Sequence, residues 1–152
     1  MLRMFLLSFI SFAMLSGCAT STSVLTSIAP RPSSIQTAAF VPDHGNTSEM
    51  DENLKQQLAA QGIRITTLLP VGTRSTKLAD LMVSYMDEWH WDVANYISML
   101  TVNLYDAETG AMLVSGRWKE ADMHTFHDPN TLLKELLTEM ISRLKRQPGR
   151  AN

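Results

Sequence analysis

The chain has 152 residues, enough for one domain with a modest core. Hydrophobic residues make up 45% of it and charged residues 18%, a balance typical of globular proteins that argues against wholesale disorder. The formal charge is −2 at pH 7, so the chain has no general positive field for nucleic acid or anionic lipid. We therefore expect no nucleic-acid partner.

The N-terminal stretch has the pattern of an export signal. Arg3 is followed by the apolar run 4–15, which has signal-peptide length and is too short to span a bilayer as a helix. The next residues complete the run Leu15-Ser16-Gly17-Cys18, which resembles the lipobox of bacterial lipoprotein precursors. The resemblance implies that 1–17 is a signal peptide, recognised through Leu15, Ser16 and Gly17. An ordinary secretory signal is the alternative, but it requires small residues before the cut.

Cys18 is the single cysteine of the chain, so we expect no disulfide, cysteine-based metal site or catalytic thiol in the folded part. The lipobox resemblance implies that Cys18 carries diacylglycerol and fatty acid, and two or more acyl chains anchor a protein stably. Ala19 follows in place of Asp, which resembles the pattern exported to the outer membrane. The expected location is the periplasmic face of the outer membrane, with no cofactor besides the covalent lipid.

The segment after the cysteine is rich in small polar residues. Half of residues 19–34 are Ser or Thr, and two prolines interrupt them. Such a composition buries little apolar surface, so we expect 18–34 to be the lipidated cysteine and a flexible tether. Fully extended, this tether would reach on the order of 50 Å.

A globular domain is expected over 35–147, followed by a disordered tail at 148–152. Its first half has a short strand at 35–41 and a helix capped by Thr47 or Ser48 that runs to about Gln61. Gly62 supplies the stop of this helix. Two further strands are predicted at 63–69 and 80–91, joined by a loop.

The second half of the domain contains the clearest signals. Strands at 96–105 and 111–118 flank the turn 106–110, whose last residue, Gly110, suits the left-handed region. Asp128 and Pro129 then begin a helix with a wide apolar stripe. The element order predicts an α+β fold: a single mostly antiparallel sheet of about five strands with two helices packed on one face.

Alternation along the strand 80–91 places Asp87, Trp89 and Trp91 on one face. Together with Trp118 they form a candidate interaction surface, although tryptophans at strand ends also close cores. His90, His124 and His127 lie near carboxylates and give a weaker alternative, a Zn²⁺ or Cu²⁺ site. Otherwise no metal site is expected. No nucleophile elbow or phosphate loop occurs, so we expect no enzyme activity and no catalytic residues.

Three further stretches carry a resemblance to known envelope proteins. They are 80–85 (DLMVSY), 88–92 (EWHWD) with Tyr96, and the hairpin end 113–116 (LVSG). The pattern resembles small bacterial outer-membrane lipoproteins of an uncharacterised family. Their α+β periplasmic domain is similar to modules of the curli-secretion lipoprotein, the TolB N-terminal domain and penicillin-binding-protein activator lipoproteins. Such modules act by protein–protein contact, which implies an accessory or docking subunit with an envelope protein partner. A lipoprotein that binds metal or cell-wall glycan is the alternative.

Overall fold

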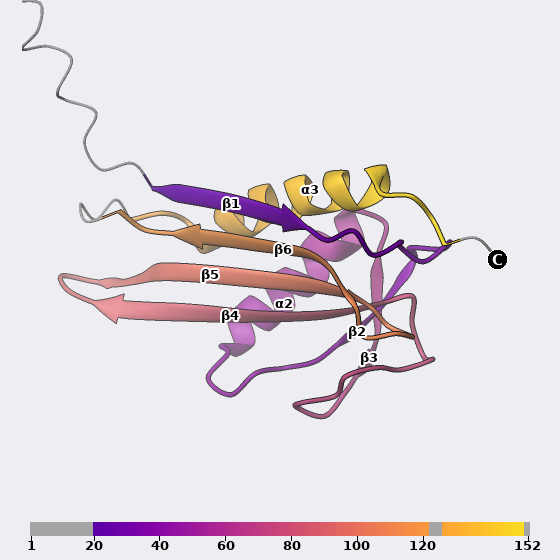
Figure 1. Cartoon of the computed structure of the whole chain (residues 1–152). Helices are drawn as coiled ribbons and strands as arrows, with labels where there is room; N and C mark the ends of the chain where they lie inside the picture. The colour runs from indigo at the N-terminus through magenta and orange to yellow at the C-terminus, as the bar shows by residue number, and fades with distance from the viewer. Residues whose placement is uncertain (1–19, 122–125, 151–152) are drawn as a thin grey trace, which may run out of the picture.

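The computed structural model describes residues 20–121 and 126–150 (Figure 1). It contains six strands and two helices within those ranges, which confirms the predicted α+β class. The elements are β1 (Ser21–Thr26), β2 (Thr37–Phe40), α2 (Ser48–Ala60), β3 (Arg64–Leu68), β4 (Leu81–Trp91), β5 (Asn95–Asp106), β6 (Met112–Lys119) and α3 (Pro129–Arg146).

All six strands belong to one mixed sheet with the order β1-β6-β5-β4-β2-β3. The four strands β1, β6, β5 and β4 pair antiparallel, whereas β2 pairs parallel with both β3 and β4. A parallel pair needs a crossover connection, and α2 supplies it between β2 and β3. The sheet is therefore mostly antiparallel, as predicted, with a parallel edge that the sequence pattern did not reveal.

Both helices cover the same face of the sheet, as predicted (Figure 1). The side chain of Thr47 caps α2 and that of Asp128 caps α3, each accepting a hydrogen bond from a backbone N–H in the first turn. Gly62 ends α2 with a φ of 83°, which a residue without Cβ adopts at little cost. One apolar core lies between the sheet and the two helices.

Gly116 of β6 sets how closely α3 approaches the sheet. A Cβ atom at this position would lie 2.4 Å from the Sδ of Met140 and 2.9 Å from the Cδ1 of Leu136. Both helix side chains are buried, so they occupy the space that any larger residue at 116 would need. The glycine thus permits α3 to pack directly on the strand.

The prediction of a flexible tether over 18–34 is wrong for Ser21–Thr26, which form the edge strand β1. This strand runs antiparallel to β6, with Thr22 opposite Trp118 and Val24 opposite Gly116. Val24 alone of its side chains is buried, because an edge strand can expose polar residues on both faces. The segment is too polar to order by itself and is held by its pairing with β6 and by side chains of α3.

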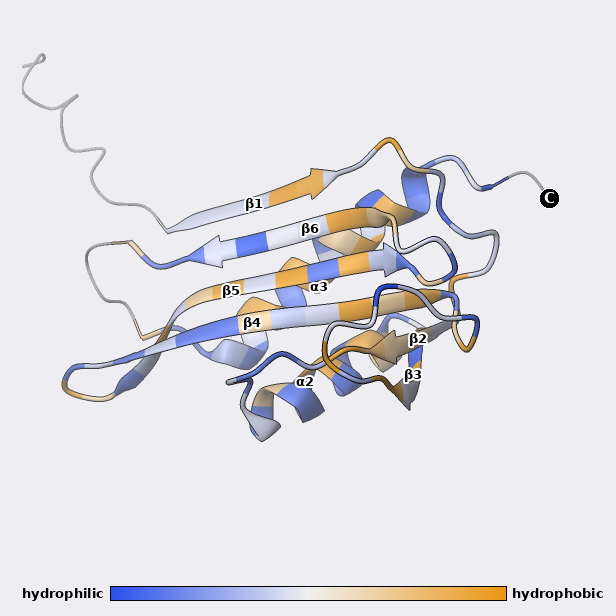
Figure 2. Cartoon of the chain, turned by 60° about the horizontal axis from the view of Figure 1, so that its bottom comes forward, coloured by the Kyte–Doolittle hydropathy of each residue, from blue (hydrophilic) through white to orange (hydrophobic). Residues whose placement is uncertain are grey.

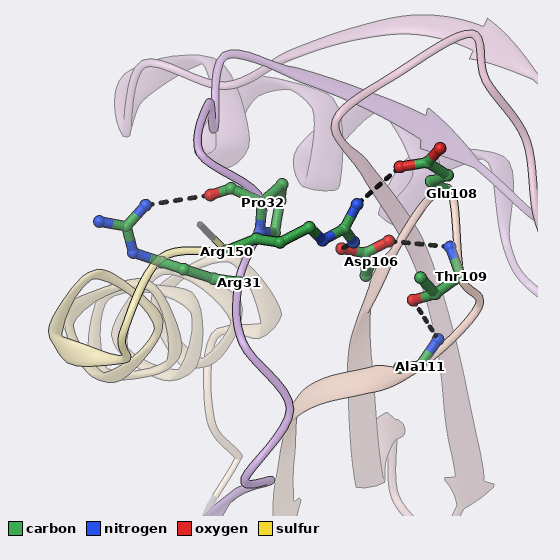
Figure 3. Close-up of polar contacts among 7 residues, drawn as sticks. All are labelled: Arg31, Pro32, Asp106, Glu108, Thr109, Ala111 and Arg150. Atoms are coloured by element: carbon green, nitrogen blue, oxygen red, sulfur yellow. Dashed lines mark hydrogen bonds and ion pairs between the residues drawn. The ribbon is translucent and has the colours of Figure 1, made fainter. Parts of the chain in front are cut away.

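The prediction of a disordered tail at 148–152 is wrong for residues 148–150. Arg31 and Gly149 form a parallel bridge, in which the Arg31 amide donates to the carbonyl of Pro148 and the Arg150 amide donates to that of Arg31. The Arg150 side chain forms ion pairs with Asp106 and Glu108 (Figure 3). The N-terminal and C-terminal segments therefore hold each other at the end of the sheet.

The lipobox, Leu15 to Cys18, lies outside the described residues, as do the predicted signal peptide and His124. Within 20–121 and 126–150, neither helix has the length and apolar character needed to cross a bilayer.

Candidate interaction surface

Asp87, the first residue of the predicted surface, is nearly buried, with an exposed fraction of 9%. Its Oδ2 accepts a hydrogen bond from the indole Nε1 of Trp89 at 2.6 Å and one from the Thr47 hydroxyl at 3.3 Å. Its Oδ1 is buried without a hydrogen-bond partner. Asp87 thus holds Trp89 and the cap of α2 together on the helix-covered face and is not an open interaction site.

Tyr85 extends this polar cluster into the core. Its hydroxyl lies 2.6 Å from Oδ1 of Asp51 and 3.1 Å from the carbonyl oxygen of Thr47, while its ring stacks on Phe40. Burial, the hydrogen bond to Asp51 and the negative charges of Asp51 and Asp87 together raise the pKa of Tyr85 above its ordinary value. The tyrosine therefore stays a neutral hydrogen-bond donor that positions α2 on β4.

The three tryptophans of the predicted interaction surface occupy three different environments. Trp118 is buried in the core, where the ring of His127 packs edge-on against it at a centroid distance of 5.3 Å. Trp89 is 38% exposed and Trp91 is 77% exposed. Trp118 therefore closes the core, and Trp91 is the tryptophan that an external partner can reach.

The exposed fraction rises from Asp87 to Trp91 because the strands of the sheet extend further than the helices that cover it. Strands β4 and β5 continue past the helices as a long hairpin, so side chains beyond Asp87 gradually lose their cover (Figure 1). Asp87, Trp89 and Trp91 share one strand face as the alternation predicted, yet the helix layer covers mainly the first of them.

The histidines of the metal-binding alternative make separate contacts. The ring of His90 lies 6.1 Å from that of Tyr96, whereas Nε2 of His127 lies 3.9 Å from a carboxylate oxygen of Glu120. Among the described residues, no three His, Cys, Asp or Glu side chains come close enough to hold a metal ion. Since His124 lies outside those residues, the metal-binding alternative stays a prediction.

The sequence did not mark out the second face of the sheet, which neither helix covers (Figure 2). At its centre, Met86 and Leu25 are exposed beside a hollow of about 450 Å³. Nearer the C-terminal end of β5, the loop 70–74 overhangs a cavity of about 580 Å³ whose lining includes Met82, Arg74 and Tyr105. We call this side the open face. No motif predicts it, because it depends on where the helices pack.

No family model matches the chain, and no curated protein matches it. The fold is similar to that of the PelC dodecamer from Paraburkholderia phytofirmans, with a TM-score of 0.54 and 14% identity over 88% of this chain and 100% of that chain. A methionine variant of the same dodecamer gives a TM-score of 0.51 and 15% identity over 85% and 100% of the two chains.

TolB from Acinetobacter baumannii is similar at a TM-score of 0.47 and 11% identity, over 84% of this chain and 31% of that one. At such identities the likeness concerns the fold alone. The α+β arrangement of this chain is found in the PelC structures, whose TM-scores exceed 0.5.

Proposed function

We propose that the chain is a lipid-anchored outer-membrane lipoprotein whose domain serves as an accessory or docking subunit through protein–protein contact. The observation that carries this proposal is the open face, a sheet surface that combines exposed apolar side chains with shallow hollows and that neither of the two described helices covers. A folded domain with such a face has a natural place for a second protein.

The side chains of the open face suit adaptable protein contact. Met86 and Met112 are exposed there, and methionine fits irregular partner surfaces because its side chain is flexible and polarisable. Ser115 and Asn103 lie between the apolar positions and hydrogen-bond each other at 2.7 Å. This mixture of apolar and polar groups is typical of a non-obligate interface.

The lipobox supports the location. Cys18 stands three residues before Ser21, the first residue of β1, so a lipid on Cys18 would hold the domain directly at the membrane. A second copy of the chain is one candidate partner, since the similar PelC is a dodecamer. Another envelope protein is the other.

Site-specific crosslinking in intact cells tests the docking role. A photoreactive amino acid at position 86 lies on the open face, whereas one at Lys134 lies on the exposed side of α3. We expect a crosslinked species of higher mass from position 86 and none from position 134, with mass spectrometry naming the partner. Equal yields from both positions, or none from position 86, contradict a docking role for the open face.

The anchor is tested separately by Cys18→Ser. We expect the wild type to carry acyl mass and to fractionate with the outer membrane, and the variant to remain an unprocessed precursor without that mass. A wild-type product that lacks fatty acid contradicts the lipoprotein assignment whatever the open face does.

A ligand-binding lipoprotein is the second candidate function. The cavity beneath the loop 70–74 favours it, because Arg74 and Tyr105 offer polar groups beside apolar walls. Exposed Trp91 is a second place where a sugar ring could stack. Titration of the purified lipoprotein with muropeptides, Zn²⁺ and Cu²⁺ in a calorimeter tests this function, and flat titrations with all three contradict it.

A further inference from the structure

Three large apolar side chains are exposed at one end of the sheet. Trp91 and Val93, in the β4–β5 hairpin, are 77% and 86% exposed, and Phe126, which precedes α3, is 61% exposed. We call these three residues the apolar tip. They come from two separate segments of the chain.

The described contacts bring the two segments together. The ring of Phe126 meets that of Tyr96 edge-on at a centroid distance of 6.2 Å, and Tyr96 is paired with His90 across the hairpin. Trp91, the next residue, is paired with Asn95 at the end of the ladder. Phe126 therefore lies beside the hairpin that carries Trp91 and Val93.

The apolar tip lies at the end of the sheet where β1 begins (Figure 1). The strand registers fix this arrangement, because Ser21 pairs with Lys119, Lys119 with Met99, and Met99 with Glu88. Trp91 lies three residues beyond Glu88, which corresponds to about 10 Å along the strand.

The segment between Cys18 and β1 is long enough to span the same distance. Cys18 precedes Ser21 by three residues, and three residues span at most about 10 Å. A lipid on Cys18 thus lies within about 10 Å of Ser21. Trp91 lies about the same distance beyond Glu88, which is in the same row of paired residues as Ser21. The hairpin and the anchored cysteine can meet one flat surface.

From this geometry we infer that the apolar tip lies in the head-group layer of the bilayer that holds Cys18, so that the domain is docked on lipid in a fixed orientation. The inference rests on the lipid anchor of the proposed function. Tryptophan favours the membrane–water boundary, where its ring is in contact with apolar groups and its N–H stays hydrated. The exposed tip presents Trp91 in that manner.

The anchor makes a small contact area sufficient. Once Cys18 is in the membrane, contact of the tip is intramolecular, with an effective concentration on the order of millimolar. Contact of the tip with lipid would be too weak to bring an unanchored protein to the membrane, but in the anchored protein it is formed for much of the time.

The charges near the tip set its depth and its lipid preference. Asp92 stands between Trp91 and Val93 and is exposed, so its carboxylate must remain in the hydrated head-group layer. Glu88 is also exposed on the hairpin. The tip therefore inserts shallowly and binds zwitterionic lipid without help from anionic head groups.

Docking through the tip leaves the open face to the side. The strands run away from the tip toward the opposite end, where the described C-terminal residues lie (Figure 1). With the tip on the bilayer, the strands point away from the membrane and the open face looks sideways, parallel to the bilayer plane. A protein partner anchored in the same membrane can then reach it.

Bromolipid quenching of tryptophan fluorescence tests the orientation. The lipidated full chain is reconstituted in phosphatidylcholine vesicles that carry bromine either near the head-group end or near the terminal end of the acyl chain. We expect the shallow bromine to quench the emission at least twofold more than the deep one. Trp91→Phe should lose at least half of the quenching, because Trp118 is buried in the core and Trp89 is only half as exposed as Trp91.

A displaced tryptophan is the matched control. Leu78 is exposed near the start of β4, at the opposite end of the sheet, so the double variant Trp91→Phe and Leu78→Trp carries an exposed indole far from the tip. We expect no added quenching from it. Quenching equal to that of the wild type overturns the inference, as does a wild-type Trp91 that bromolipid does not reach.

The same samples separate the two proposals. Intact mass and flotation report on the anchor: a chain without acyl mass that fails to float contradicts the lipoprotein assignment. A chain that is acylated and floats, but whose Trp91 is shielded from an aqueous quencher and not from bromolipid, supports docking on lipid. Shielding from the aqueous quencher without bromolipid quenching shows that a second copy of the chain covers the tip, and this result overturns the inference alone.

Discussion

The Nη1 atom of Arg143 donates a hydrogen bond to the backbone carbonyl oxygen of Val24, 2.6 Å away. Arg143 lies in the last turn of α3, and Val24 lies in the middle of the edge strand β1. Gln147 adds a second connection, since its Nε2 donates to the carbonyl of Ser27 at 3.1 Å. The C-terminal helix thus holds the strand that follows the predicted lipidation site.

Replacing Arg143 with Ala should loosen β1. The carbonyl of Val24 loses a charged donor, and we expect the free energy of unfolding to fall by about 1 kcal/mol, measured by urea denaturation. Hydrogen exchange should show faster exchange of the β1 amides than of those in β5. Arg146→Ala is the control, because the exposed Arg146 side chain donates within its own helix, to Ser142. Equal effects of the two substitutions contradict the role of Arg143.

Gly116→Ala should destabilise the packing of α3 on the sheet. The new Cβ would need the space filled by Met140 and Leu136, and overpacking of this kind costs about 1–3 kcal/mol. Thermal unfolding followed by circular dichroism measures the loss. Gly149→Ala is the matched control, because its Cβ would lie 3.8 Å from the nearest atom, in the Arg31 side chain. If the Gly116→Ala variant is as stable as the wild type, α3 can shift away from the sheet without loss of stability, which contradicts its tight packing on β6.

Trp89→Phe and Trp91→Phe should differ although the two residues share one strand face. Loss of the Trp89 indole N–H removes the closest donor to the nearly buried carboxylate of Asp87, at a cost of about 1–3 kcal/mol. Trp91 is exposed, so its substitution should change the stability by less than about 0.5 kcal/mol. Urea denaturation of both variants gives the comparison, and similar stabilities are the result that conflicts with the described hydrogen bond.

Acid should weaken the contact between the chain ends through Asp106. Burial raises the pKa of this carboxyl group, but hydrogen bonds from Thr109 and the ion pair with Arg150 outweigh burial and leave the pKa below its ordinary value. A depressed pKa in the folded state stabilises the protein above about pH 4, and this stabilisation is lost as the pH falls through the lower folded value.

The urea midpoint of the wild type should therefore decrease from pH 7 to pH 3, and Asp106→Asn should show a smaller decrease. Glu108→Gln is the control, since Glu108 contacts the same arginine from an exposed position and leaves Asp106 in place. An Asp106→Asn variant with the full wild-type decrease shows that other carboxylates account for the acid sensitivity.

Local signals in the sequence identified most of the elements. The sequence offers Thr47 or Ser48 as one helix cap and Asp128 as the other, because short polar side chains accept the free amides of a first helical turn, and the structure selects Thr47 and confirms Asp128. Gly110 was placed in a left-handed turn, and its φ of 72° confirms this. These features depend on neighbouring residues, so reading the chain in order is sufficient to find them.

The candidate surface was less well predicted. Alternation correctly grouped Asp87 with Trp89 and Trp91, but it carries no information on which side chains the helices cover. Trp118 is buried because β6 lies beneath α3, and Trp91 is exposed because the hairpin continues past the helices. The open face likewise exists only once both helices have packed on the other side.

By itself the sequence determined the types and approximate positions of the elements after β1, several caps and turns, and the lipobox resemblance, because each depends on a few adjacent residues. The tertiary structure alone decided that the polar segment Ser21–Thr26 is a strand and that Arg150 meets Asp106, 44 residues away. A polar segment becomes ordered when a distant strand supplies hydrogen-bond partners, and its own composition does not reveal that partner.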